Sequence, residues 1–259
     1  MPRIQGVYYI MKCNEKWMEQ KESAGVDTGG CSPRKAIGTD MTTEERRTRF
    51  HRTRGEELAN GFTHLAGVLF GVYGLWAMLS QADGDVWKLV SAWIYGGTLI
   101  LLTLSSTLYH FAVNYRRKVL FQFMDHCTIY FLLAGTFTPI ALVTLARELQ
   151  GWLFFTVEWA MLVLGLLLEC GSPKLAERFS LYVYLFMGWI ILAFMPGICR
   201  VMDIAGIGWL FGGGVAYTSG VAFFLMDRKP YMHSVWHLFA LAGIFCHWMC
   251  IMNYVICPQ

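Results

Sequence analysis

The sequence contains little charge and no sign of a disulfide framework. Only 15% of the 259 residues are charged, whereas 56% are hydrophobic. This shortage of charge excludes an ordinary soluble domain and indicates a membrane protein. The eight cysteines lack any Cys-x-x-Cys spacing, so they predict free, inert thiols. No internal repeat is apparent either, which argues against a transporter built from inverted halves.

Long apolar runs take up most of the remaining chain. Runs of about 20 residues are long enough to cross a bilayer as helices, whereas barrel strands would be about 10 residues long and alternating. A chain in lipid must also satisfy its backbone hydrogen bonds internally, which helices do. We therefore expect an all-α integral membrane bundle of seven transmembrane helices, near 62–80, 89–113, 127–145, 152–168, 181–199, 207–226 and 234–257.

The basic residues are distributed unevenly between the two ends of these runs. Eighteen of the 21 Lys and Arg residues precede the first run or follow the second, fourth and sixth runs. The opposite side carries only Lys88, Arg147 and Arg200. Short loops rich in Lys and Arg stay in the cytoplasm. The pattern predicts a cytoplasmic N-terminus, an outside C-terminus and residence in the plasma membrane.

The chain divides into a polar head and the apolar region. Residues 1–55 are basic and lack a sustained apolar period, so they predict an extension with little fixed structure. Its arginines, Arg52 among them, are expected to be attracted to anionic lipid headgroups. Residues 56–259 form the seven-helix domain, in which Pro139 and Pro196 predict kinks.

Several ionisable side chains are expected at one depth in the membrane. His233 and His237 are four residues apart at the start of the last run, which places both imidazoles on one helix face. His110 ends the second run, with Ser106 one turn away on the same face, and Asp125 opens the third. Each of these positions lies toward the cytoplasmic end of its run, so we expect the side chains to converge.

Three neutral imidazoles and a water form the ligand set of a catalytic zinc ion. We therefore expect His110, His233 and His237 to bind Zn²⁺. Asp125 is either a fourth ligand or a carboxylate that holds and deprotonates the bound water, and Ser106 is expected to hydrogen-bond that water or the substrate. The alternative for each histidine is a hydrogen-bonded boundary residue without a metal.

Four other ionisable residues in the runs are weaker candidates. His126 points about 100° away from Asp125, so both are not expected to enter one site. His64 has a comparable depth and is an alternate or supporting residue. His247 lies ten residues beyond His237, about 15 Å deeper, and cannot share that metal. Glu158, in the middle of the fourth run, either hydrogen-bonds another helix or lines a polar cavity.

Four segments that contain these residues resemble the hemolysin III family, within the superfamily of progestin and adipoQ receptors. They are Glu-Glu-Leu-Ala-Asn-Gly-Phe-Thr-His-Leu-Ala-Gly at 56–67, Ser-Thr-Leu-Tyr-His at 106–110, the stretch from Met124 to Pro139, and His-Ser-Val-Trp-His-Leu-Phe at 233–239. The resemblance implies seven helices and zinc near the cytoplasmic leaflet. The family's ligand positions fall on His110, His233 and His237, and its site carboxylate and serine on Asp125 and Ser106.

The resemblance implies two competing functions. Adiponectin-receptor relatives are linked to ceramide hydrolysis, whereas bacterial members are named for cytolytic, pore-like activity. We expect a zinc-dependent hydrolase of a lipid amide or ester, with membrane lipids as surroundings and substrate and no nucleic-acid partner. The alternatives are a pore or cytolysin in which zinc only links helices, and a receptor or scaffold.

Overall fold

The structure is a computed structural model that describes residues 52–146 and 149–258. Seven helices in these ranges are long and apolar enough to cross a membrane, which confirms the predicted all-α, multi-pass fold. Most of the predicted extension, including residues 1–51, lies outside the described residues. The spans are formed by α4 (Arg54–Ser80), α5 (Val86–Phe111), α6 (Tyr115–Pro139) with η1 (Ile140–Thr144), α7 (Leu149–Gly171), α8 (Pro173–Trp189) with η2 (Ile190–Phe194) and α9 (Met195–Val201), α10 (Ile204–Leu225), and α11 (Met232–Ile251) with η3 (Met252–Ile256).

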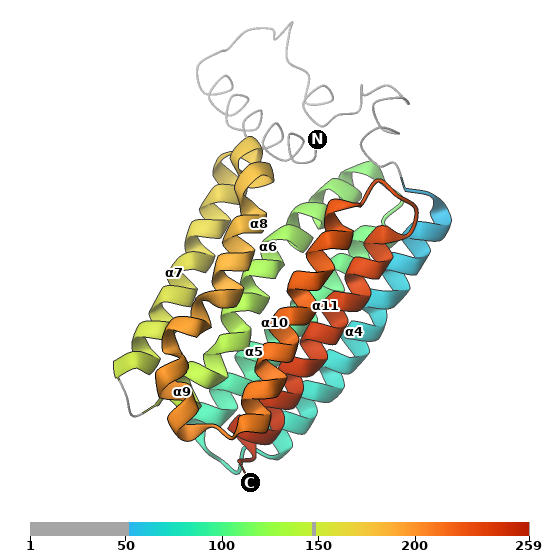
Figure 1. Cartoon of the computed structure of the whole chain (residues 1–259). Coiled ribbons are helices and arrows are strands. Elements are labelled where there is room, and N and C mark those ends of the chain that lie inside the picture. The colour runs from blue at the N-terminus through green and yellow to red at the C-terminus, as the bar shows by residue number, and fades with distance from the viewer. Residues whose placement is uncertain (1–51, 147–148, 259) are drawn as a thin grey trace, which may run out of the picture.

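The helices run up and down, so every second connection lies at the same end of the bundle (Figure 1). At one end α5, α7 and α10 finish and α4, α6, α8 and α11 begin, and we call this the histidine end. The most extensive packing joins α5 to α4 and α6, and α10 to α11. Contacts between α11 and α4 bring the first and last spans together. Which membrane face the histidine end occupies stays a prediction.

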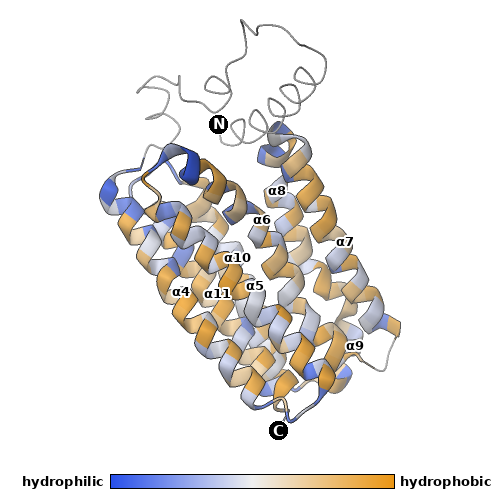
Figure 2. Ribbon diagram, turned by 180° about the vertical axis from the view of Figure 1, so that it is seen from behind, coloured by the Kyte–Doolittle hydropathy of each residue, from blue (hydrophilic) through white to orange (hydrophobic). Residues whose placement is uncertain are grey.

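Figure 2 shows apolar residues along the length of the helices and hydrophilic residues gathered toward their ends. Large side chains such as Phe62, Leu69 and Trp76 remain exposed on the outer surface of α4. A soluble protein would bury such a surface, whereas in a bilayer it contacts acyl chains as favourably as it would contact a protein core. The exposed apolar surface therefore agrees with the seven spans.

The helices begin earlier than the apolar runs predict. α4 begins at Arg54 because Thr53 and Glu56 form a capping box, in which each side chain accepts a backbone N–H of the other residue. α6 begins at Tyr115, where the Asn114 side chain accepts two backbone N–H groups. Polar first turns such as these are helical although they are not apolar. Asp125, predicted to open its span, therefore lies about three turns inside α6.

Both prolines coincide with a change in helix type. Pro139 ends α6 and is followed by the π-helical segment η1. Pro196 lies in the first turn of α9, directly after the 3₁₀ segment η2. Proline lacks the N–H that continues an α-helix, and its ring clashes with the preceding turn. The helix type thus changes beside both prolines, and the kinks themselves stay predictions.

Candidate metal centre

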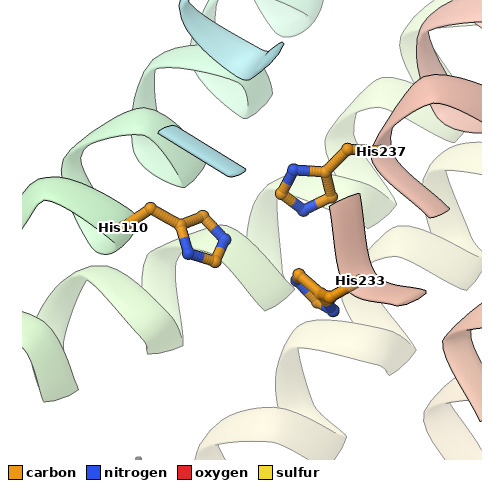
Figure 3. A group of neighbouring side chains, drawn as sticks. All are labelled: His110, His233 and His237. Carbon is orange, nitrogen blue, oxygen red and sulfur yellow. The ribbon is translucent and has the colours of Figure 1, made fainter. Parts of the chain in front are cut away.

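Three histidines from two helices meet at the histidine end. His110 lies in the last turn of α5, and His233 and His237 lie in the first turns of α11. One ring nitrogen from each can be chosen so that all three lie within 4.8 Å of one another. Figure 3 shows the imidazole of His110 directed toward the two imidazoles of α11. The geometry suits a metal ion bound between the helices, as the sequence predicts.

The hydrogen bonds of these histidines leave one nitrogen of each ring available. Nδ1 of His110 lies 2.8 Å from Oε2 of Glu57, and Nδ1 of His237 lies 3.3 Å from the carbonyl oxygen of Asn60. Nδ1 of His233 lies 3.1 Å from Oδ1 of Asp227, although the alignment is poorer than in a hydrogen bond. Each Nδ1 therefore faces an oxygen atom, as in the histidine ligands of many metal proteins.

The opposite nitrogens provide a test of whether a metal fits. Nε2 of His110 and Nε2 of His233 are buried and have no hydrogen-bond partner among the described residues. A buried polar atom without a partner costs free energy, and a ligand that uses its lone pair removes that cost. Imidazole nitrogens in this number suit zinc, and also copper or nickel. The donor set fits a divalent transition metal.

Two carboxylates of this centre are each paired with a basic side chain. Arg52 Nη2 lies 2.6 Å from Asp227 Oδ1, and Lys118 Nζ lies 3.0 Å from Glu57 Oε1. Burial alone would lower the pKa of Arg52, but attraction to Tyr109 and Asp227 outweighs it and raises the pKa above its ordinary value. The Arg52 side chain is only 7% exposed. Its predicted location among lipid headgroups is therefore wrong, because it pairs with Asp227 inside the protein.

Ser106 and Asp125 lie close together beside the cluster. The Ser106 hydroxyl is buried without a well-aligned hydrogen bond among the described residues, and it faces Asp125, which also interacts with the charge of Arg52. Asp125 is not one of the residues whose ligand atoms gather within 4.8 Å. The catalytic roles expected of Asp125 and Ser106 stay predictions.

The remaining histidines of the spans lie outside the three-histidine group. The ring of His64 is 3.8 Å from that of His237 by centroid, and neither of its nitrogens has a partner in the described part of the chain. His126 accepts a hydrogen bond from Tyr184 through its backbone carbonyl. Nε2 of His247 lies 3.2 Å from the carbonyl of Leu210. His64 thus adjoins the candidate centre, and the other two do not belong to it.

Glu158 is enclosed within the bundle. Phe154 and Leu162, one turn away on either side along α7, are also buried. Neither carboxylate oxygen of Glu158 has a hydrogen-bond partner among the residues that the structure describes. Of the two alternatives, the hydrogen bond to another helix is therefore not present there, and the polar cavity stays a prediction.

Sequence reasoning missed the side chains that surround the imidazoles. Glu57 and Asp227 were given no role, although Glu57, Asn60 and His64 follow one another at intervals of three and four residues. That spacing places them on one face of a helix. It was a usable signal for Glu57 and Asn60, whereas Asp227 lies in a turn before α11 and has no periodic pattern to reveal it.

Comparisons with known proteins agree with this fold and this cluster. The family model described as Haemolysin-III related matches residues 52–248. Hemolysin-3 of Bacillus cereus is 32% identical over 214 residues, which cover 82% of this chain and 97% of that protein. The Hemolysin-3 homolog of Bacillus subtilis (strain 168) is 34% identical over 203 residues, 78% of this chain and 95% of that protein. The human monocyte to macrophage differentiation factor is 28% identical over 216 residues, 80% of this chain and 87% of that protein. The chain belongs to the haemolysin-III related family.

Proposed function

We propose that the protein is a zinc-dependent hydrolase that cleaves an amide or ester bond of a membrane lipid. The observation that carries the proposal is the convergence of His110, His233 and His237 inside membrane-spanning helices, with Nε2 of His110 and of His233 unpaired. Three protein ligands leave a coordination position open, which is typical of catalytic rather than structural zinc sites. Buried ionisable groups in spans are costly and usually mark a functional site.

Under this proposal the three imidazoles hold the metal. A zinc ion bound there would act as a Lewis acid and would lower the pKa of its water to about 7. Asp125 takes the proton of the attacking water as general base. The water oxygen bonds to the carbonyl carbon, the carbon–nitrogen or carbon–oxygen bond breaks, and Asp125 delivers the proton to the leaving amine or alcohol. Ser106 hydrogen-bonds the water or the substrate.

The proposed location explains the choice of a lipid substrate. The excess of Lys and Arg on one side predicts that the histidine end lies at the cytoplasmic face of the plasma membrane. The amide or ester bonds of lipids lie at the boundary between headgroups and acyl chains, which is the depth expected for the ends of spanning helices. Membrane lipids would then be both the surroundings and the substrate.

The test is an assay of purified protein with a panel of lipid amides and esters, in detergent and in liposomes, with and without a chelator. Asp125→Asn should retain zinc but lower the rate of hydrolysis by roughly 10² to 10⁴, the range for loss of a general base. Glu169→Gln is the matched control, since Glu169 is a buried carboxylate at the histidine end that is bonded to Ser180 and lies outside the cluster. It should hydrolyse at the wild-type rate.

The alternative function is a pore or cytolysin in which the metal only links helices. It is favoured by the position of the imidazoles on α5 and α11, both of which pack against α4, and by the name Hemolysin-3 of two relatives. This alternative predicts dye leakage from liposomes that survives chelation, with no lipid turnover. That result would reject the hydrolase, whereas chelator-sensitive turnover that depends on Asp125 would reject the alternative.

A further inference from the structure

Two carboxylates outside the ligand set each contact one of the three imidazoles and one basic side chain. Glu57, in the first turn of α4, contacts His110 through Oε2 and Lys118 through Oε1. Asp227, in the turn between α10 and α11, contacts both His233 and Arg52 through Oδ1. Each acid therefore joins one imidazole to one basic side chain, although the two acids come from segments far apart in the sequence.

We infer that Glu57 is a positioning residue of the metal centre, with Asp227 in the parallel position at His233; this inference rests on the metal binding proposed above. An ionised carboxylate only accepts hydrogen bonds, so the imidazole nitrogen that faces it must carry the hydrogen. Glu57 therefore selects the tautomer of His110 with hydrogen on Nδ1. The lone pair of Nε2 is then directed away from Glu57.

The direction of Nε2 is what gives Glu57 its effect on the metal. The ring centroid of His110 lies 5.1 Å from that of His237 and 5.4 Å from that of His233. Figure 3 shows both ring nitrogens of His110. The one that is farther from the backbone lies on the side of the other two rings. With the tautomer and the ring orientation both fixed, His110 is ready to bind before the metal arrives, which saves the cost of ordering the ring on binding.

Both carboxylate oxygens of Glu57 have a partner, His110 at Oε2 and Lys118 at Oε1. Its side chain is 16% exposed, and Lys118 Nζ, at 3.0 Å, supplies an opposite charge. Lys118 in turn donates to the carbonyl oxygen of Tyr109, the residue before His110. Glu57 and its partner Lys118 thus contact two consecutive residues of α5, so α4 orients the metal centre without supplying any of the three imidazoles.

Zinc affinity, measured by competition with a chelator of known affinity, provides the test. Glu57→Ala should lower the zinc affinity of the full chain by about 10- to 100-fold, the usual loss when a ligand's hydrogen-bond partner is removed. Glu57→Gln keeps a carbonyl oxygen that can accept from Nδ1, and should lose less. The matched control is Glu56→Gln, because Glu56 is the neighbouring acid but contacts Thr53 and the backbone of Tyr231 instead. It should bind zinc as the wild type does.

A second variant separates positioning from charge and from misfolding. Glu57→Ala alone leaves the Lys118 ammonium near the metal, and this charge would itself repel a cation. The double variant Glu57→Ala with Lys118→Met removes both charges. If Glu57 positions His110, the double variant stays weak in zinc binding, and its Co²⁺-loaded form shows d–d absorption bands that are shifted from those of the wild type. Recovery of wild-type zinc affinity and wild-type Co²⁺ bands in the double variant would overturn the inference.

The metal site and the positioning role can fail separately. Wild-type protein that binds no zinc would reject the proposed metal site itself. Wild-type protein that binds zinc, loses it in His110→Ala and keeps it at full affinity in Glu57→Ala would reject only the positioning role.

Discussion

Two of the three imidazoles in the histidine cluster have one nitrogen committed to a hydrogen-bond contact within the protein. For His110 the committed nitrogen faces Glu57, and for His237 it faces the carbonyl of Asn60. Thr63 also lies beside Nδ1 of His237, and its hydroxyl donates to the backbone of its own helix, so it can act only as an acceptor there. Such committed nitrogens fix the tautomers of the rings. Residues of α4 therefore orient the rings of His110 and His237, whereas His233 faces Asp227, which lies outside α4.

His64 provides the sharpest test of which residues are ligands. Its ring lies against that of His237, with a centroid separation of 3.8 Å and planes tilted by 41°, and it is 5% exposed, but it is not in the three-histidine group. We expect His64→Phe, which keeps an aromatic ring, to retain about one zinc per chain, whereas His237→Ala should lose most of it. Zinc content of the purified variants, measured by elemental mass spectrometry, decides this. Loss of zinc from His64→Phe with full zinc in His237→Ala would show that the ligand set is misassigned.

At the scale of elements, the sequence predicts the number of spans from the length of the apolar runs. It also predicts the end of the bundle at which each span begins, because successive spans alternate in direction. Seven apolar runs predict seven spans, and alternation of direction alone places His110 and His233 at one end of the bundle. The starts of α4 and α6 were predicted too late because Thr53, Glu56 and Asn114 extend the helices through polar turns. Contacts such as Glu57 with His110 depend on how each helix is rotated toward its neighbours. Apolar run length carries no information about that rotation.

The approach of α7 to η1 is the closest backbone contact that a single substitution can test. A Cβ on Gly151 would lie 2.5 Å from the carbonyl oxygens of Ala141 and Leu145, and these backbone atoms cannot rotate away as a side chain would. We expect Gly151→Ala to lower the free energy of unfolding by about 1 to 3 kcal/mol, as overpacking usually does. Thermal unfolding of the protein in detergent measures the change. Gly97→Ala in α5 is the control, because no atom lies within 4 Å of its Cβ position.

That control should be neutral or stabilising, since alanine favours a helix over glycine by about 1 kcal/mol. Equal unfolding temperatures for Gly151→Ala and Gly97→Ala would mean that α7 can move away from η1 at little cost. The packing of η1 would then not hold α7 in place.

At the scale of the whole molecule, function depends on which membrane face the histidine end occupies. The seven helices are equally compatible with either orientation, because each span satisfies its own backbone hydrogen bonds. The positive charges break this symmetry, since 18 of the 21 Lys and Arg residues belong to the tail and to the connections at the histidine end. In the orientation that these charges predict, a lipid hydrolase at that end would act on the cytoplasmic leaflet and release its products there.

Two native cysteines allow this orientation to be tested without introducing new ones. Cys170 near the end of α7 and Cys199 in α9 are both exposed, and they lie at opposite ends of the bundle. In intact cells, a membrane-impermeant thiol reagent should label Cys199 and leave Cys170 unlabelled, because the positive charges place Cys170 inside. Cys199→Ser and Cys170→Ser assign the signal, with Cys257→Ser added because Cys257 is partly exposed at the same end as Cys199. Labelling that persists in Cys199→Ser with Cys257→Ser, and disappears only when Cys13, Cys31 and Cys170 are also replaced by serine, would invert the topology and place the histidine cluster in the outer leaflet.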